Sequence, residues 1–246
     1  MKIIKLDAID STNSFLKELA QNSVLEDYTI AITDKQISGR GQMNKSWHSE
    51  PFKNLTFSTF TQLKDIKTIH QSYLNLAISL AIYDSLNNLS VPNLTIKWPN
   101  DIMAGNFKIC GILIETTLNQ KKIKNIIIGI GLNVLQEKFP NHIKNASSLK
   151  NLINIDFNFE ELMLKIIKQL QFRVSEIENG NFQKVNDEYH RVLYKKGIPS
   201  TFLDTTTQLL FMGIIVGVSK TGKLRIQIED DSILEYGIKE VSFAKV

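Results

Sequence analysis

The chain contains a single cysteine, Cys110, among its 246 residues. One cysteine excludes an internal disulfide framework and the paired spacing of a zinc site. Within the apolar run at 108–113, Cys110 is therefore predicted to be a small buried hydrophobic residue. The four histidines, at 48, 70, 142 and 190, are scattered and form neither a metal-binding nor a triad pattern. With no G-x-S-x-G motif either, the sequence gives little support to covalent acyl chemistry, and no metal site is expected.

Long apolar runs and targeting signals are also missing. No window approaches about 18 uncharged apolar residues, which excludes a membrane-spanning helix. Charges interrupt the opening run MKIIKLDAID, so no secretory signal peptide is expected. The formal net charge of +4 is too small and too dispersed to indicate nucleic-acid binding. We therefore expect a cytoplasmic protein that binds neither DNA nor a membrane.

Hydrophobic patterning predicts a mixed α+β domain followed by a small all-β domain. Strands are expected at 28–33, 55–60, 94–98, 109–116 and 123–134, and helices at 15–20, 70–89, 159–177 and 182–193. The helix at 70–89 carries apolar residues so continuously that it should be largely buried. After the Gly-Ile-Pro at 197–199, strand-like runs at 208–218, 223–228 and 233–236 predict a small antiparallel sheet or barrel. The expected domains are residues 1–196 and 197–246.

The stretch KWPNDIMAGNFKICGILIE, at 97–115, is the most informative part of the chain. It places Lys97, Asn100, Asp101 and Lys108 within a dozen residues, between runs that are typical of buried strands. Charges beside apolar strands are costly unless they bind something charged, and this cluster points to an anion such as phosphate. Asp101 could help to hold Mg²⁺ or orient a nucleophile, or it could simply cap a turn. Lys108 is expected to project into a cleft rather than to be a solvated strand end.

Three other segments are candidates for ligand contact. In the polar segment at 38–47, glycines flank Arg40, whose planar fork suits a carboxylate or phosphate, and Lys45 adds a point charge. A plain surface turn explains the G-R-G equally well, since it lacks the spacing of a P-loop or dinucleotide fingerprint. Two glycines in the strand at 128–133 indicate a bulge or a close approach, with Asn133 at its end. The Ser-Thr-Asn at 11–13 supplies helix caps, or lines a polar pocket.

Together these segments resemble the catalytic core of biotin protein ligases. The elements occur in order: S-T-N, a G-R-G-x-x-x-x-x-W loop, K-W-P-N-D, K-x-x-G-I-L-x-E and G-I-G-x-N. The resemblance is strong over 9–133 and weak in the C-terminal domain. It implies an α+β fold with a mixed or antiparallel sheet and flanking helices, followed by a small SH3-like β-barrel. It also implies a reaction with biotin, ATP and Mg²⁺. Biotin is first activated as biotinyl-5′-AMP, and a lysine of a biotin carboxyl carrier domain, of acetyl-CoA carboxylase or a related enzyme, then displaces AMP.

The resemblance also assigns roles to individual residues. It places Ser11, Thr12, Asn13, Gln36, Arg40, Gly41, Gln42, Lys108 and Gly111 around biotin, and Arg40, Lys45, Trp47, Asn100, Lys108 and Asn133 toward the nucleotide. The catalytic set is Lys108, Arg40, Lys97 and Asp101. Lys108 would contact both the biotin carboxylate and the phosphate, with Lys97 in support. Asp101 would orient the incoming lysine or the metal-bound phosphates.

The sequence departs from the family in two places. Many relatives carry a G-R-G-R-x-G-R loop, whereas Gln42, Met43, Asn44 and Lys45 stand here, so the grip on phosphate should rest more on Arg40, Lys45 and Lys108. Some relatives carry an N-terminal helix-turn-helix that acts as a repressor. Here the catalytic motif begins by residue 11, which leaves no room for that element, so a ligase without repressor function is expected. A lipoate- or octanoyl-transfer enzyme is the nearest alternative, disfavoured because no R-R-x-S-G-G-G loop occurs. A non-enzymatic DNA-binding regulator with a ligand-sensing domain is the second alternative, and the missing helix-turn-helix argues against it. The resemblance leaves a homodimer open.

Overall fold

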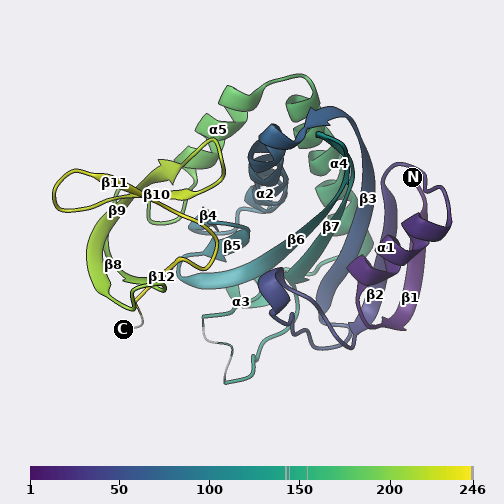
Figure 1. The fold of residues 1–246 in the computed structure, drawn as a ribbon. Helices are drawn as coiled ribbons and strands as arrows, with labels where there is room; N and C mark the ends of the chain where they lie inside the picture. The colour runs from purple at the N-terminus through teal and green to yellow at the C-terminus, as the bar shows by residue number, and fades with distance from the viewer. Residues whose placement is uncertain (142, 144, 154, 245–246) are drawn as a thin grey trace.

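The fold is described from a computed structural model that covers residues 1–141, 143, 145–153 and 155–244 (Figure 1). It is an α+β fold in which a seven-stranded mixed sheet, flanked by helices, is followed by a five-stranded antiparallel sheet. The predicted α+β class, with a mixed sheet and flanking helices, is therefore confirmed. None of the described helices is long and apolar enough to cross a membrane.

The seven-stranded sheet carries most of the expected ligand-contacting segments. Its strands are β1 (Ile3–Ile9), β2 (Thr29–Gln36), β3 (Asn54–Lys67), β4 (Leu94–Lys97), β5 (Asp101–Ala104), β6 (Phe107–Asn119) and β7 (Lys122–Asn133). They lie in the order β1-β2-β3-β7-β6-β5-β4, and only the β1–β2 pair is parallel. The long strands β3, β7 and β6 therefore form the centre of the sheet, and the short β5 and β4 form one edge (Figure 1).

Helices cover both faces of this sheet. The helix α1 (Thr12–Asn22) packs on one face, where Leu16 meets Ala31, Phe60 and Ile127. The opposite face packs against α2 (Gln71–Asn87) and α4 (Phe159–Glu178), joined by α5 (Phe182–Arg191) and the short α3 (Leu149–Ile153). Since α2 is apolar around most of its circumference, it is buried between the sheet and the outer helices, as predicted for residues 70–89.

A buried ion cluster joins the three long helices of this layer. The Arg173 guanidinium from α4 contacts the carboxylates of Asp84 at 2.7 Å and Glu176 at 2.8 Å, and also that of Glu188. Burial raises the pKa of Asp84 above its ordinary value, although Arg173 opposes that rise. Glu176 is also paired with Lys184, so Asp84 and Glu188 are the carboxylates that depend on Arg173, and removing its guanidinium would leave their largely buried charge unpaired.

The second sheet consists of β8 (Pro199–Asp204), β9 (Leu210–Val218), β10 (Leu224–Gln227), β11 (Ile233–Tyr236) and β12 (Val241–Phe243), in the order β11-β10-β9-β8-β12. Stacked rings of Phe202, Phe211 and Tyr236 fill its interior. This sheet is fixed to the first part of the chain by polar contacts as well. The Trp98 Nε1 donates to the Gly222 carbonyl at 3.0 Å, and the Val218 N–H donates to His190 Nε2 at 2.8 Å.

Several short elements were not predicted. The strand β5 begins at Asp101, between the two strands expected at 94–98 and 109–116, because residues 98–100 turn the chain back so that β5 pairs with both β4 and β6. The strands β8 and β12 and the helix α3 were also missed. The strand expected at 28–33 extends to Gln36, and the polar segment that follows contains a 3₁₀ turn at Gln42–Asn44. Elements of three to six residues depend on their partners more than on their own pattern.

Candidate active site

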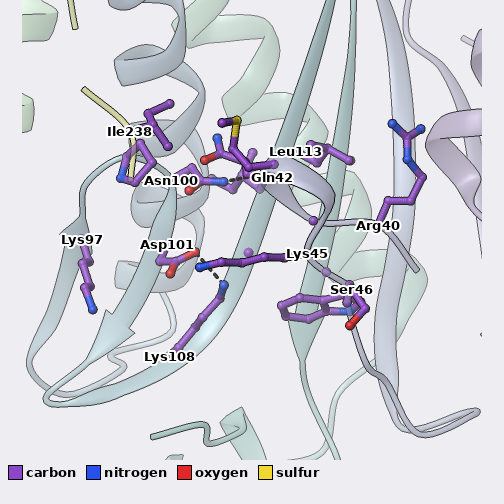
Figure 2. Close-up of a pocket in the computed structure, with 18 of the residues that line it drawn as sticks. Arg40, Gln42, Lys45, Ser46, Lys97, Asn100, Asp101, Lys108, Leu113 and Ile238 are labelled. Atoms are coloured by element: carbon purple, nitrogen blue, oxygen red, sulfur yellow. Dashed lines mark hydrogen bonds and ion pairs between the residues drawn. The ribbon is translucent and has the colours of Figure 1, made fainter. Parts of the chain in front are cut away.

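A cavity of about 580 Å³ opens between the two sheets, with walls from both (Figure 2). The first part of the chain contributes residues 11–13, Gln36, the segment 40–43 with 45–47, residues 97–101, Lys108 and positions 111–113 and 129–131. The second sheet contributes residues that include Phe202, Ile238, Lys239 and Phe243. Every segment singled out in the sequence therefore reaches one cavity, whose volume suits a ligand of drug size.

Lys108 and Asp101 form an ion pair on the wall of the cavity that β5 and β6 contribute. Their Nζ and Oδ1 atoms are 2.6 Å apart, and both side chains are about one-third exposed or less. They meet because β5 and β6 are adjacent antiparallel strands, and Lys108 pairs with Met103, two residues along β5 from Asp101. Lys45 extends toward the pair from the 40–46 segment (Figure 2). Lys108 thus projects into the cavity, as predicted, and Asp101 is its counter-ion.

Lys97 adds a further cation on the neighbouring edge strand. Its Nζ lies 5.3 Å from the ring centre of Phe243 and 5.9 Å from that of Tyr194. Burial lowers the pKa of Lys97, and the nearby Lys108 ammonium acts in the same direction, although Asp101 opposes it. Three lysines around one carboxylate leave this wall with an excess of positive charge. Such a wall favours an anionic group, as the sequence pattern indicated.

The end of the cavity around residues 11–13 and Gln36 is polar, and the charged residue that borders it, Arg40, is paired with Glu115. Ser11 is the N-cap of α1 and accepts a hydrogen bond from the Ser14 N–H, so the capping interpretation holds for this residue. Thr12 instead faces Ser58 on β3, with 2.7 Å between their hydroxyl oxygens, and its N–H donates to Gln36 Oε1 at 3.0 Å. Sequence reasoning missed Ser58, whose only signal was a small hydroxyl inside an apolar strand.

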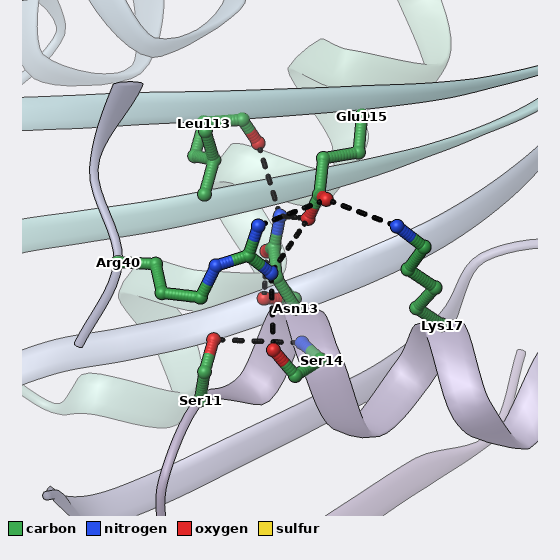
Figure 3. Close-up of polar contacts among 8 residues, drawn as sticks. Ser11, Asn13, Ser14, Lys17, Arg40, Leu113 and Glu115 are labelled. Atoms are coloured by element: carbon green, nitrogen blue, oxygen red, sulfur yellow. Dashed lines mark hydrogen bonds and ion pairs between the residues drawn. The ribbon is translucent and has the colours of Figure 1, made fainter. Parts of the chain in front are cut away.

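Arg40 points away from the lysine cluster. Its guanidinium contacts Glu115 on β6, with 3.2 Å from Nη2 to Oε1, and donates to Ser14 Oγ at 3.0 Å (Figure 3). Burial alone would raise the pKa of Glu115, but hydrogen bonds from Asn13 and the charge of Arg40 lower it below its ordinary value. Glu115 was present in the K-x-x-G-I-L-x-E motif but was not identified as a site residue.

Glycines on the central strands let side chains lie flat against the sheet. Gly111 and Gly131 pair directly across β6 and β7, and the Trp47 indole rests on both. A Cβ at Gly131 would overlap that indole, lying 2.6 Å from its Nε1, and one at Gly129 would overlap the Asn13 amide. The β6–β7 register is regular at these positions. Of the two interpretations of the paired glycines, close approach is therefore right and a bulge is wrong.

Two asparagines are committed to the framework. Asn100 is buried, and its Nδ2 donates to the Ile112 carbonyl, so the turn is fastened to β6. Asn133 Nδ2 donates to the Ser147 carbonyl at 2.9 Å, and Asn133 does not line the cavity. Asn100 does border the cavity, whereas the structure leaves Asn133 behind it.

The lone cysteine does not line the cavity. Cys110 is fully buried, as predicted, and burial raises the pKa of its thiol. His142 falls outside the described residues. Within the part of the chain that the structure describes, no three His, Cys, Asp or Glu side chains gather to hold a metal ion.

Comparison with known proteins identifies the family. The profile of the Biotin/lipoate A/B protein ligase family matches residues 6–133, more than half of the chain. The bifunctional ligase/repressor BirA of Bacillus spizizenii is 28% identical over 99% of this chain and 73% of that protein. The biotin–[acetyl-CoA-carboxylase] ligase of Mycobacterium tuberculosis is 29% identical over 74% and 68%. The structure of the Aquifex aeolicus biotin protein ligase in complex with biotin and ATP is similar, with a TM-score of 0.80 and 27% identity over 100% and 99%. The chain belongs to the biotin/lipoate A/B protein ligase family.

Proposed function

We propose that this protein is an ATP-dependent biotin–protein ligase, which activates biotin as biotinyl-5′-AMP and transfers it to a lysine of a carrier domain. The observation that carries the proposal is the arrangement of one cavity. Lys108 and its neighbouring cations line one side, and a polar end is built around Thr12 and Gln36. An elongated ligand with a neutral polar ring and an anionic end would match both ends.

The chemistry of the first step requires two anions to meet. A carboxylate oxygen must bond to the α-phosphorus of ATP while the α–β phosphoanhydride bond breaks and pyrophosphate leaves, and the positive wall offsets the repulsion between the two anions. Lys108 would turn from Asp101 toward the carboxylate and phosphate oxygens, while Lys45 and Lys97 maintain the surrounding positive potential. Holding both reactants in one cavity supplies much of the remaining rate enhancement, up to about 7–11 kcal/mol for well-oriented groups.

In the second step, the carrier lysine must reach the anhydride as a neutral amine. Asp101 is the carboxylate beside Lys108, so it is placed to orient that amine once Lys108 has moved to the phosphate. Arg40, Gly41 and Gln42 would cover the adenylate from the 40–46 segment. We assign Ser11, Asn100 and Asn133 framework roles, because each side chain already has a backbone partner.

Magnesium is compatible with this cavity as a partner of ATP. Mg²⁺ is commonly held by one or two carboxylates together with the phosphates of the substrate, and keeps several waters. Asp101 is the one acidic residue among those that line the described cavity, so it is the candidate carboxylate. When bound, the ion would neutralise charge on the transferred phosphates.

Three further proposals concern organisation and partners. Residues 1–196 and 197–246 would be two domains, the second a small SH3-like barrel, which its five short antiparallel strands and its own aromatic interior support. The acceptor would be the biotin carboxyl carrier domain of acetyl-CoA carboxylase or a related enzyme. A homodimer joined through the first sheet is the corresponding oligomeric proposal, which sedimentation velocity would test.

The direct test is adenylate formation with MgATP and labelled biotin or lipoate. Biotin should give the adenylate, and formation with lipoate alone would overturn the proposal. Lys108→Ala should lower the rate about 100-fold or more, because one charge-stabilising donor is lost, while the fold is kept. Lys124→Ala, on the exposed part of β7 and outside the cavity wall, is the matched control. Near-normal turnover in a folded Lys108→Ala protein would remove Lys108 from its role.

A further inference from the structure

A chain of hydrogen bonds leads from the polar end of the cavity into the sheet, and the proposed function gives no role to its far end at Ser58 and Glu115. It links Glu115, Asn13, Ser58, Thr12 and Gln36, from β6 through α1 and β3 to β2. Asn13, Ser58 and Thr12 are each at most 3% exposed. Because a polar network this deeply buried is costly when any member is unpaired, its orientation is strongly determined.

Glu115 fixes the first link of this chain. The Asn13 Nδ2 lies 3.0 Å from Glu115 Oε2 and 3.4 Å from the Leu113 carbonyl oxygen (Figure 3). An ionised carboxylate and a carbonyl only accept hydrogen bonds, so the amide NH₂ must face them. The Asn13 Oδ1 is thereby turned toward Ser58, whose Oγ lies 2.5 Å away. A reversed amide would set its oxygen against the Glu115 carboxylate.

The remaining links follow from counting protons. Ser58 has one hydroxyl proton and gives it to Asn13 Oδ1, so Thr12 Oγ1 must be the donor in the 2.7 Å contact with Ser58. The Thr12 N–H donates to Gln36 Oε1, which holds the Gln36 amide with its oxygen inward and its Nε2 toward Gly39. Thr12 Oγ1 also lies 3.3 Å from Gln36 Oε1, a longer contact than its 2.7 Å contact with Ser58. Thr12 and Gln36 both line the cavity, so the Thr12 hydroxyl and the Gln36 amide are presented to it in one fixed pattern.

We propose that Glu115 is a positioning residue, which sets this donor and acceptor pattern through Asn13 and so prepares the site for a cyclic urea such as the ring of biotin. The proposal rests on the proposed function and deepens it. A urea ring presents both N–H donors and a carbonyl acceptor, so a site whose own donors and acceptors are fixed in advance binds it without first reorienting side chains. Glu115 itself lies behind Asn13 and needs no contact with the ligand.

Glu115 has two other partners, and they define the competing explanation. Arg40 and Lys17 both approach its carboxylate, at 3.2 Å and 3.5 Å. If Glu115 served only to hold these cations, removing Lys17 would reproduce part of its loss, and removing Ser58 would not. If Glu115 acts through Asn13, the reverse holds, because Ser58 shares no contact with the cations and lies further along the same chain.

The test measures KM for biotin, KM for MgATP and kcat of adenylate formation in the full chain, together with thermal unfolding. Glu115→Ala and Ser58→Ala should each raise the biotin KM about tenfold, with kcat and the MgATP KM within about twofold, because ground-state recognition of the ring is lost. Glu115→Gln should lie between them and the wild type, since its amide oxygen still accepts from Asn13. Lys17→Ala is the matched control and should leave all three constants within about twofold.

Unchanged biotin KM in folded Glu115→Ala and Ser58→Ala proteins would overturn the proposal. An equal rise in the KM for biotin and for MgATP would do so too, since it would indicate general damage to the cavity. Should Glu115→Ala fail to fold, Ser58→Ala decides the matter, because it removes one hydroxyl and leaves every ion pair in place. Failure of the wild-type protein to use biotin at all would instead refute the proposed function.

Discussion

Replacing Gly129 or Gly131 by alanine adds one methyl group to the same face of β7, two residues apart, yet the two changes should have different costs. Neither glycine has a positive φ, so the backbone accepts alanine at both positions. What differs is the group that the methyl would meet. At Gly129 it is the buried Asn13 amide, and at Gly131 it is the indole of Trp47.

The Gly129→Ala change should be clearly destabilising. Asn13 would have to turn away, which breaks its hydrogen bond to the Ser58 hydroxyl and its charge-assisted bond to Glu115. Losing one neutral and one charged hydrogen bond costs roughly 2.5–4 kcal/mol. Alanine recovers about 0.4–1 kcal/mol by restricting the unfolded chain. The net loss is then about 2–3 kcal/mol, which corresponds to a fall in Tm of roughly 4–12 °C for a chain of this size.

The Gly131→Ala change should be nearly neutral for stability. Trp47 belongs to a surface segment and can swing outward, and its buried Nε1 has no hydrogen-bond partner among the described residues, so no such bond is lost. The lost packing is about 1 kcal/mol for a half-buried side chain, close to the gain from the unfolded state. The Tm should therefore change by less than about 3 °C.

Thermal unfolding followed by circular dichroism measures both changes, with urea titration as an independent check of the free energy of unfolding. Biotin affinity by calorimetry serves as a second readout. It should fall in both variants, since each methyl group intrudes on the cavity wall. Equal losses of Tm in the two variants would refute the reasoning, as would a larger loss for Gly131→Ala, because the Asn13 network would then not be what resists the methyl group.

Three other changes have defined outcomes. Burial lowers the pKa of His190 in the folded protein, and its Nε2 must be unprotonated to accept from the Val218 N–H. The contribution of this imidazole to the free energy of unfolding is therefore complete above about pH 6.5, the pKa in the unfolded chain, and is lost as the pH falls through the lower pKa of the folded state. His190→Gln should flatten that loss in urea titrations between about pH 7 and 5, and an unchanged slope would argue against His190 as its source. Arg173→Met leaves Asp84 and Glu188 without their cation, while Glu176 keeps Lys184, and should cost about 3–5 kcal/mol in the same titration. A cost below about 1 kcal/mol would show that the cluster is solvated. Lys239→Met removes a 3.0 Å hydrogen bond to the Met43 carbonyl and should speed proteolysis between residues 40 and 46. Lys223→Met, at an exposed position, is the control and should not change the rate of cleavage. Biotin with ATP should slow cleavage in the wild type and in both variants.

The long elements could be predicted from the sequence because their patterns are local. The helix α2 is apolar around most of its surface, and α4 repeats its apolar positions at helical spacing, so each identifies itself. The strand β5 has four residues and β12 has three, and both form through pairing with strands that are distant in the chain or reached only by a turn. No pattern of that length distinguishes such a strand from a loop.

The candidate site divides in the same way. Lys108 and Asp101 are seven positions apart, so their proximity followed from the sequence. For Gly129 and Gly131 the sequence indicated a bulge or a close approach, and the structure was needed to decide for the close approach. The pairing of Arg40 with Glu115 did not, because it joins residues 75 positions apart and depends on which of several cations reaches that carboxylate. Ser58 was missed because its role depends on hydrogen bonds to Thr12 and Asn13, which belong to another element. The sequence around a single serine in a strand does not indicate such partners.

The contact of the Trp47 indole with Gly111 and Gly131 has a practical consequence. The chain has only two tryptophans, Trp47 and Trp98, and both line the cavity. All of the tryptophan fluorescence of the protein therefore comes from the wall of the cavity. Trp47 lies on the segment at 40–47, over Gly111 and Gly131, and Trp98 is hydrogen-bonded to Gly222 of the second part of the chain. A ligand that displaces the first ring changes the surroundings of half of the emitters at once. The intrinsic fluorescence of the unlabelled protein should therefore report ligand binding in the cavity, and stopped-flow fluorescence can follow each half-reaction.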